Sequence, residues 1–252
     1  MKQQDVTAQA FGNAARDYLS SAVHASGADL DWLRDSVAGA GGGRVLDLGC
    51  GAGHASFAVA AAARTVCAYD LSEAMLEVVR DAARERGLDN LTVAQGPAET
   101  LPFEDGSFDC VVSRMSAHHW YDVAAGLREA YRVLRPGGRF FLVDIAAAQH
   151  PLHDTYFQAV EVLRDVSHVR DYRVDEWLGH FAKAGFDAAL SAQWRLRIDF
   201  DSWVARMRTP PERVAAIRSL WRAAPVEVRT HYRVEPDDSF QMEALSLSAT
   251  RA

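Results

Sequence analysis

The sequence predicts an α/β fold: a Rossmann-like, doubly wound sheet of seven mostly parallel strands with helices on both faces. Three observations predict it. The apolar segment 44–48 leads into glycines at positions 49, 51 and 53, followed by an alanine-rich helical segment. Short apolar segments then alternate with helical patterns as far as about residue 147, which is typical of βαβ units. Two late segments with alternating apolar residues complete the sheet, and the second is expected to be its one antiparallel strand.

The individual elements follow from local patterns along the chain. Strands are expected at 44–48, 65–69, 91–95, 108–113, 139–145, 187–198 and 239–249. Helices are expected at about 5–22, 28–38, 54–60, 73–86, 122–134, 151–165 and 175–184, and then as an insertion at 202–207 and 211–224. The first two helices form a lid or pack against an edge of the sheet. The Arg-Pro-Gly-Gly turn at 135–138 is expected to stop both helix and strand.

Length and composition indicate one globular domain. The 252 residues divide into N-terminal helices (1–40), a core (41–150) and a C-terminal part (151–252), with 49% apolar and 24% charged residues. A net charge of −7 argues against duplex nucleic acid as a partner. The three cysteines fit no metal motif, and no apolar run approaches the ~20 residues that span a bilayer. We therefore expect a cytoplasmic protein without a metal, a signal peptide or a membrane span.

The ligand is expected at the carboxyl ends of the strands, in the loops 47–54, 70–75, 95–99, 113–121 and 144–150. The glycine spacing is G-x-G-x-G, and His54 stands where a dinucleotide motif would continue, which disfavours a nicotinamide cofactor. The carboxylate of Asp47 would repel a pyrophosphate but attract a sulfonium or ammonium group. The alternative is that it only accepts hydrogen bonds from the amides of the glycine turn. Asp70 is placed to accept both hydroxyls of a ribose, with helix capping as the alternative.

Four motifs in this order resemble those of class I S-adenosylmethionine-dependent methyltransferases: residues 45–53, 70–75, 95–103 and 134–138. Within that superfamily the start, Phe11-Gly12-x-x-Ala15-x-x-Tyr18, is similar to the ubiquinone/menaquinone methyltransferase-like branch, the methyltransferases of type 11. The segments 113–120, 167–170 and 202–210 are similar to a group of YafE-like bacterial methyltransferases. The resemblance covers residues from about 8 to 147 and implies a Rossmann-like fold.

The resemblance implies S-adenosylmethionine as the methyl donor, S-adenosylhomocysteine as the product and no metal. The residues that it places at the cofactor are Asp47, Gly49, Cys50, Gly51, Gly53, Asp70, Leu71, Met75, Ala98, Glu99, Ser113 and Arg114. Asp47 and the glycines would surround the methionine part of the cofactor, and Asp70 would bind its ribose. Leu71, Met75, Ala98 and Glu99 would lie beside its adenine. Many relatives carry aspartate where this chain has Pro97, so backbone groups or Glu99 must bind the adenine amine.

The sequence also offers candidate residues for contact with the methyl acceptor. His118 and His119 follow the fourth strand, and we expect at most one, with His119 favoured, to act as a general base rather than in packing. Further candidates for acceptor contacts are Tyr18, Trp120, Arg206 and Arg208. The segment 195–233 holds nine arginines against four acids, with tryptophans interleaved, and is either a solvated helical face or a lid over an aromatic or anionic molecule.

These features predict methyl transfer, by direct displacement, to O, N or C of a small aromatic or acidic metabolite. The expected partner is a small-molecule methyl acceptor, and the protein is expected to be a monomer or homodimer. Two alternatives stay open: a non-catalytic S-adenosylmethionine-binding scaffold and, less favoured, an RNA methyltransferase.

Overall fold

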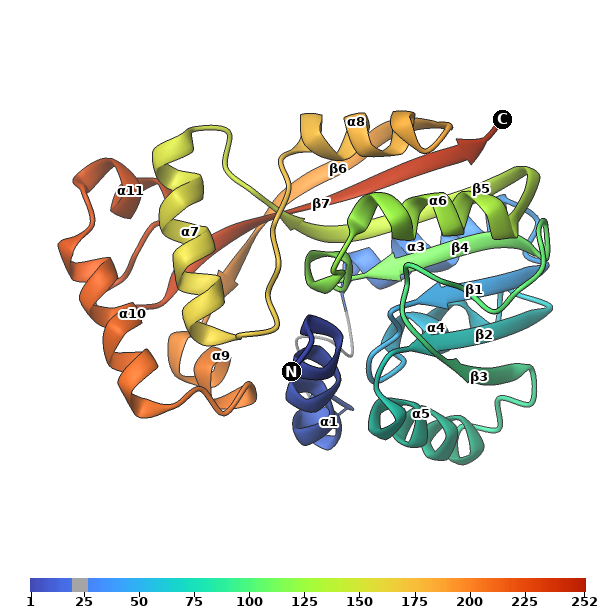
Figure 1. Cartoon of the computed structure of the whole chain (residues 1–252), viewed down its shortest axis with the longest axis horizontal. Helices are drawn as coiled ribbons and strands as arrows, with labels where there is room; N and C mark the ends of the chain where they lie inside the picture. The colour runs from blue at the N-terminus through green and yellow to red at the C-terminus, as the bar shows by residue number, and fades with distance from the viewer. Residues whose placement is uncertain (20–26) are drawn as a thin grey trace.

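The computed structural model describes residues 1–19 and 27–252, and only the backbone of residues 13–18. Its seven strands form one sheet in the order β3-β2-β1-β4-β5-β7-β6 (Figure 1). The strands are β1 (Arg44–Leu48), β2 (Thr65–Asp70), β3 (Leu91–Gln95), β4 (Phe108–Arg114), β5 (Leu134–Ala146), β6 (Phe186–Ile198) and β7 (Phe240–Arg251). The first five run parallel, and β7 pairs antiparallel with both β5 and β6. The predicted fold, including its one antiparallel strand, is confirmed.

The helices also follow the predicted order. They are α1 (Gln3–Leu19), α3 (Ala28–Gly39), α4 (His54–Ala60), α5 (Glu73–Glu85), α6 (Val123–Val133), α7 (Pro151–Arg164), α8 (Val174–Lys183), α9 (Phe200–Arg206), α10 (Pro211–Ala223) and α11 (Val226–His231). The predicted end of the first helix, at 20–22, lies outside the described residues. The sequence analysis missed α11 and the 3-10 turn η1 (Ala117–His119). No helix among the described residues is long and apolar enough to cross a bilayer.

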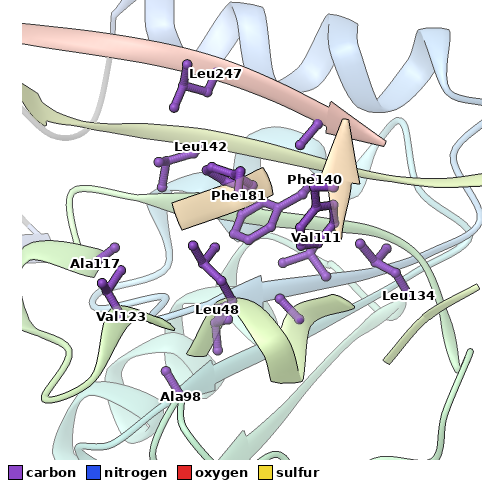
Figure 2. Packing of buried hydrophobic residues seen from close by; sticks show 14 of the residues in the cluster. Leu48, Ala98, Val111, Ala117, Val123, Leu134, Phe140, Leu142, Phe181 and Leu247 are labelled. Carbon is purple, nitrogen blue, oxygen red and sulfur yellow. The ribbon is translucent and has the colours of Figure 1, made fainter. Parts of the chain in front are cut away.

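The centre of the sheet is buried on both faces because helices cover it on both sides. Four consecutive residues of β1, from Val45 to Leu48, are buried, as expected for a parallel strand covered on both sides. On one face, Leu48 packs in a cluster with Val111, Phe140 and Leu142 of the neighbouring strands and Phe181 of α8 (Figure 2). Helices α3 and α4 cover the other face. This packing holds the carboxyl ends of β1 and β4 in place.

The turn at 135–138 differs from its prediction. We expected it to separate helix and strand, but β5 already begins at Leu134, which pairs with Phe108. Pairing resumes at Arg139 opposite Cys110, so the turn forms a bulge that stands opposite Asp109 alone. An ion pair of 2.5 Å between Arg135 and Asp109 holds this bulge against β4. A long-range pairing therefore lets the strand continue across a turn that local chemistry predicts to end it.

The C-terminal part forms a second cluster beyond the sheet's edge. The strands β6 and β7 are long, and α9, α10 and α11 connect them, as the predicted insertion requires. These helices gather with α7 at one end of the β6–β7 pair (Figure 1). Their core contains Trp203, Trp221, Phe157, Tyr232 and Phe240. The N-terminal helix α1 contacts both α5 and α9, and so lies between this part and the sheet (Figure 1).

Candidate active site at the carboxyl edge of the sheet

Two adjoining cavities lie where β1 and β4 end. The smaller has a volume of about 90 Å³ and the larger of about 530 Å³. They share a wall formed by Phe11, Gly49, Gly51, Met75, Met115 and His119. The predicted functional loops thus converge on one place, as the position of ligand sites in doubly wound sheets requires.

The glycine turn after β1 brings main chain to the surface of both cavities. Gly51 has a φ of 51°, in the left-handed region, and a Cβ at this position would have no atom within 4 Å. Gly49 also has a positive φ, of 76°, and there a Cβ would lie only 1.8 Å from the Ser116 hydroxyl. A side chain is therefore excluded at Gly49 by packing, and at Gly51 it would project into open space at the wall of both cavities.

Asp70 connects the glycine turn to the next helix. One of its carboxylate oxygens accepts a hydrogen bond of 2.8 Å from the Gly51 amide, and the other accepts one of 2.8 Å from the Ser72 amide. Ser72 in turn caps α5 by accepting from the Met75 amide. Burial raises the pKa of Asp70, although the amide hydrogen bonds oppose this shift. Asp70 lines the smaller cavity, so it holds the turn and also faces the expected ribose position.

The opposite wall of the smaller cavity comes from the loop after β3. Glu99 accepts hydrogen bonds from the Asp122 amide (3.1 Å) and from the Gln4 side chain (3.2 Å). The carbonyl of Pro97 accepts a hydrogen bond from the Tyr69 hydroxyl. Trp120 lines this smaller cavity and is buried, with its Nε1 donating to the Ser116 hydroxyl. The predicted acceptor contact Trp120 therefore lies among the predicted cofactor residues and not in the larger cavity.

Asp47 lies at the wall of the larger cavity and is fully buried. One of its carboxylate oxygens accepts a hydrogen bond of 2.5 Å from Ser56, whereas the other has no hydrogen-bond partner among the described residues. Burial raises the pKa of Asp47 to about 6. A buried carboxylate with an unpaired oxygen is unfavourable in itself, and a cationic group in the cavity would relieve it. This carboxylate suits the sulfonium or ammonium group of the expected methyl donor.

The two histidines of η1 have opposite environments. The Nδ1 atom of His118 lies 2.5 Å from a carboxylate oxygen of Asp144, which is fully buried. Burial opposes the protonation of His118, but the charge and hydrogen bond of Asp144 outweigh it and raise the pKa to about 9. His118 is therefore a cation at neutral pH. It lines the larger cavity only.

His119 lies at the junction of the two cavities. Its Nδ1 atom is 3.3 Å from the hydroxyl of Ser167, which donates its proton to Asp165 over 2.6 Å. Because Ser167 has only one proton to donate, we assign the proton of the pair to Nδ1 of His119, which leaves Nε2 as the basic nitrogen. Burial and the charge of His118 lower the pKa of His119 to about 4. His119 is therefore neutral at neutral pH.

The rest of the larger cavity is built by C-terminal elements. Four residues of β6 line it at every second position, because alternate side chains of a strand share a face: Ala192, Trp194, Leu196 and Ile198. Further contributions come from β7 (Met242 and Ser246), α9 (Trp203 and Arg206), α7 (Glu161 and Arg164) and the N-terminal helix α3 (Asp29 and Trp32). The cavity is thus mostly apolar and aromatic, with charged side chains from α7 and α9 at one part of its wall.

Most predicted cofactor residues line one of the cavities, and two do not. Gly53 begins α4 with a left-handed φ of 87°, and Ser113 donates a hydrogen bond to the Leu48 carbonyl across the β1–β4 pair. Neither is among the described residues that line the cavities. Arg114 lines the larger cavity and pairs with Asp29 over 2.5 Å. Cys50 and Asp47 line that cavity too, while Leu71, Ala98 and Glu99 line the smaller one.

The two arginines predicted to contact the acceptor lie in different places in the structure. Arg206 lines the larger cavity, whereas Arg208 is exposed and is not among the described residues at either cavity. The side chain of Tyr18 lies outside the described part of the chain. The arginine excess of 195–233 is largely neutralised by acids that follow it in the sequence, in the pairs Arg195–Glu243, Arg197–Glu235 and Arg218–Asp238. Counting the segment alone therefore overstated its charge.

Sequence reasoning missed four ionisable residues at or beside the larger cavity: Asp144, Glu161, Arg164 and Asp165. The sequence could have indicated Asp144, because it is an acidic residue within the apolar run of β5, near the carboxyl end of the strand. The other three belong to the end of α7 and its cap, where nothing local distinguishes them from solvent-facing residues. No group of three histidine, cysteine or acidic side chains in the described ranges 1–19 and 27–252 has the arrangement of a metal site.

Comparison with known proteins identifies the family. Residues 46–142 match a family model described as "Methyltransferase domain". The protein YafE of Escherichia coli (strain K12) is 46% identical over 200 residues, which are 79% of this chain and 97% of YafE. The methyltransferase YcgJ of Bacillus subtilis (strain 168) is 35% identical over 239 residues, which are 95% of this chain and 94% of YcgJ. The chain belongs to the class I S-adenosylmethionine-dependent methyltransferases.

The structure of this methyltransferase agrees with its sequence relationships. The crystal structure of YcgJ superposes with a TM-score of 0.85 at 34% identity, covering 89% of this chain and 98% of YcgJ. The predicted family, fold and enzymatic class are thereby confirmed. The described residues also fit the cofactor of a class I methyltransferase, since Gly51 leaves the cavity wall open and Asp47 offers an unpaired carboxylate oxygen.

Proposed function

We propose that the enzyme transfers the methyl group of S-adenosylmethionine to an O, N or C atom of a small aromatic or acidic metabolite by direct displacement. One observation carries the proposal: a large, mostly apolar cavity adjoins the smaller cavity at the glycine turn, with His119 and Met115 on their common wall. A methyl donor at the turn and an acceptor in the larger cavity would then meet at this junction.

The two ends of the cofactor are assigned to different residues. We place the adenosine end in the smaller cavity, with the ribose at Asp70 and the adenine between Leu71, Met75 and Glu99. The methionine end is placed at the glycine turn beside Asp47. When bound, the cofactor supplies a methyl group on a positively charged sulfur atom, an electrophile that needs little further activation. The main task of the protein is then to align the acceptor and exclude water, and orientation supplies roughly 7–11 kcal/mol of such barriers.

The two histidines divide the work on the acceptor in this proposal. His119 is neutral and lies on the common wall of the cavities, so we assign it the task of taking a proton from an O–H or N–H acceptor; the carboxylate of Asp165, 4.0 Å from its Nε2 atom, would stabilise the cation that forms. His118 is held as a cation by Asp144 and favours negative charge that develops on the acceptor. Two titratable groups whose environments move their pKa values in opposite directions are a common basis for such a division.

Titration and turnover test the proposal together. Isothermal titration calorimetry of the wild type should show binding of both S-adenosylmethionine and S-adenosylhomocysteine. Incubation with methyl-tritiated cofactor and a fractionated metabolite extract should label a small molecule. Binding without any transfer to the fractions would favour a non-catalytic scaffold. Absence of binding by the wild type would contradict the proposal altogether.

A further inference from the structure

We infer that Arg164 forms an anion-binding subsite in the larger cavity, and that the methyl acceptor is an aromatic molecule carrying a carboxylate. The inference rests on the proposed function, which assigns this cavity to the acceptor. It adds a residue that no sequence motif contains, the chemical group that this residue recognises and the part of the cavity where that group is held.

Arg164 is fixed in position before any ligand binds. Its Nε atom donates a hydrogen bond of 3.2 Å to the carbonyl of Trp203, and its guanidinium lies 4.8 Å from the centroid of the Trp203 ring. The Arg164 carbonyl accepts a hydrogen bond of 3.0 Å from Thr209. The side chain and main chain of Arg164 are thus both attached to α9 and the residues after it. An arginine held in this way loses little conformational entropy when an anion binds.

The outer nitrogens of Arg164 remain available to a ligand. Among the described residues, Arg164 has no ion pair with a carboxylate within 4.0 Å, and its Nη1 and Nη2 atoms make no hydrogen bond. The arginines Arg114 and Arg195 differ, because they pair with Asp29 and Glu243. Arg164 is half-buried and lines the larger cavity. A half-buried guanidinium whose two outer nitrogens are unused matches a carboxylate, because each carboxylate oxygen can accept a hydrogen bond from one of these nitrogens.

Glu161, three residues earlier on α7, decides whether this part of the cavity is positive or negative. Its carboxyl is buried, lines the same cavity and has no hydrogen-bond partner among the described residues. Burial raises the pKa of Glu161, which weakens its negative charge, whereas a guanidinium stays charged at any physiological pH. His118, also on this cavity, is compensated by Asp144. Arg164 of α7 and Arg206 of α9 place two guanidinium groups on this part of the wall against the single carboxyl of Glu161, which favours an anionic acceptor.

The aromatic part of the acceptor follows from the rest of the wall. Trp32, Trp194 and Trp203 line the cavity together with aliphatic side chains of β6. Flat apolar rings bind well between indole rings. Arg164 is not on the wall shared with the smaller cavity, where the methyl donor is placed. The carboxylate is therefore held for recognition, and the atom that receives the methyl group is another atom of the acceptor.

Paired probes that differ only in charge test the subsite. We would titrate the wild type with 2-naphthoate and with 2-naphthamide, and likewise with indole-3-acetate and indole-3-acetamide, by isothermal calorimetry with and without S-adenosylhomocysteine. Each carboxylate should bind about tenfold or more tightly than its amide. Arg164→Gln should remove this preference while the affinity for the amides stays the same. Arg222→Gln, which removes an exposed arginine of α10, is the matched control and should keep the preference.

Two further variants test the sign of the site. Arg164→Lys keeps the charge without the paired donors and should retain only part of the preference. Glu161→Gln should leave carboxylate binding unchanged or strengthen it. Preferential binding of 2-naphthylmethylamine, together with weaker carboxylate binding in Glu161→Gln, would overturn the inference. So would equal affinity of carboxylates and amides for the wild type. Loss of S-adenosylhomocysteine binding would instead contradict the proposed function, because the carboxylate preference is also measured without it.

Discussion

The two cavities are built by different means, although they share a wall. The smaller one is formed mainly by the turns that follow β1, β2 and β3, closed by α1 and η1, and Asp70 joins the glycine turn to the start of α5. The larger one combines side chains from α1, α3, β1, α7, β6, α9 and β7, between residues 11 and 246. Turns built from local backbone geometry are visible in short sequence motifs. A site made by packing distant elements is not.

The charged groups of the two cavities differ in the same way. Asp70 and Glu99 at the smaller cavity accept hydrogen bonds from the protein with both oxygens. At the larger cavity, Asp47, Glu161 and Arg164 each keep at least one polar atom without such a bond among the described residues. Unsatisfied ionisable groups are unfavourable in the empty protein and are typical of places where a ligand completes the interactions. Four measurements test this difference between the two cavities.

The largest effect is expected for Asp70→Ala at the cofactor end. The change removes the acceptor for the Gly51 and Ser72 amides and the proposed partner of the ribose, so two interactions are lost at once. We expect S-adenosylhomocysteine to bind about 100-fold more weakly, or about 3 kcal/mol, by isothermal calorimetry. Asp81→Ala, on an exposed part of α5, is the control and should bind normally. A loss of less than about threefold in Asp70→Ala would contradict this role.

The His118–Asp144 pair should make stability fall at alkaline pH. The folded-state pKa of His118 is raised to about 9 from an unfolded value of about 6.5, so the pair stabilises the protein fully below pH 6.5. This contribution is lost as the pH rises through 9 and amounts to about 3 kcal/mol. Urea unfolding at several pH values should show the loss in the wild type and not in His118→Gln. His180→Gln should keep it, because the pKa of His180 is lowered.

The carboxyl of Asp47 should stabilise the bound cofactor while it destabilises the empty protein. Its folded-state pKa is raised to about 6 from about 3.8, so folding is most favoured below pH 3.8, where Asp47 is neutral in both states. The penalty grows as the pH rises from 3.8 and is fully present above 6. Asp47→Asn should therefore raise the free energy of unfolding at pH 8 by about 1–2 kcal/mol and weaken S-adenosylmethionine binding. Unchanged stability with unchanged affinity would contradict the proposed placement of the sulfonium.

The smallest effect on the cofactor is expected for Trp194→Leu. Trp194 lines only the larger cavity, so the affinity for S-adenosylhomocysteine should stay within about twofold of the wild type. The affinity for 2-naphthoate should fall by about 1 kcal/mol because an aromatic contact is lost. Calorimetry with both ligands measures the two effects on one sample. A large loss of affinity for S-adenosylhomocysteine in Trp194→Leu would show that the two cavities are not independent.

Much of the fold and of the cofactor end could be predicted because the signals are local. The segment from Val45 to Gly53 specifies a buried strand, a turn that needs positive φ, and a helix start. Ser72 predicted the cap that it makes on α5. Each of these features depends on residues only a few positions apart, so hydrophobic periodicity and turn chemistry are sufficient to find it.

Other features were decided only by the tertiary structure, because they join residues distant in sequence. The turn at 135–138 became a bulge within β5 through pairing with β4, and Asp144 reaches His118 only when β5 lies beside β4. Arg208 is exposed while Arg164, without any motif, lines the cavity, because the packing of α7 on α9 sets their positions. The family and the sheet could therefore be predicted from short local patterns, and the same patterns supply the residues that we propose for the methyl donor. The larger cavity, which we propose for the acceptor, depends on packing, since its charges and shape exist only where distant helices and strands meet.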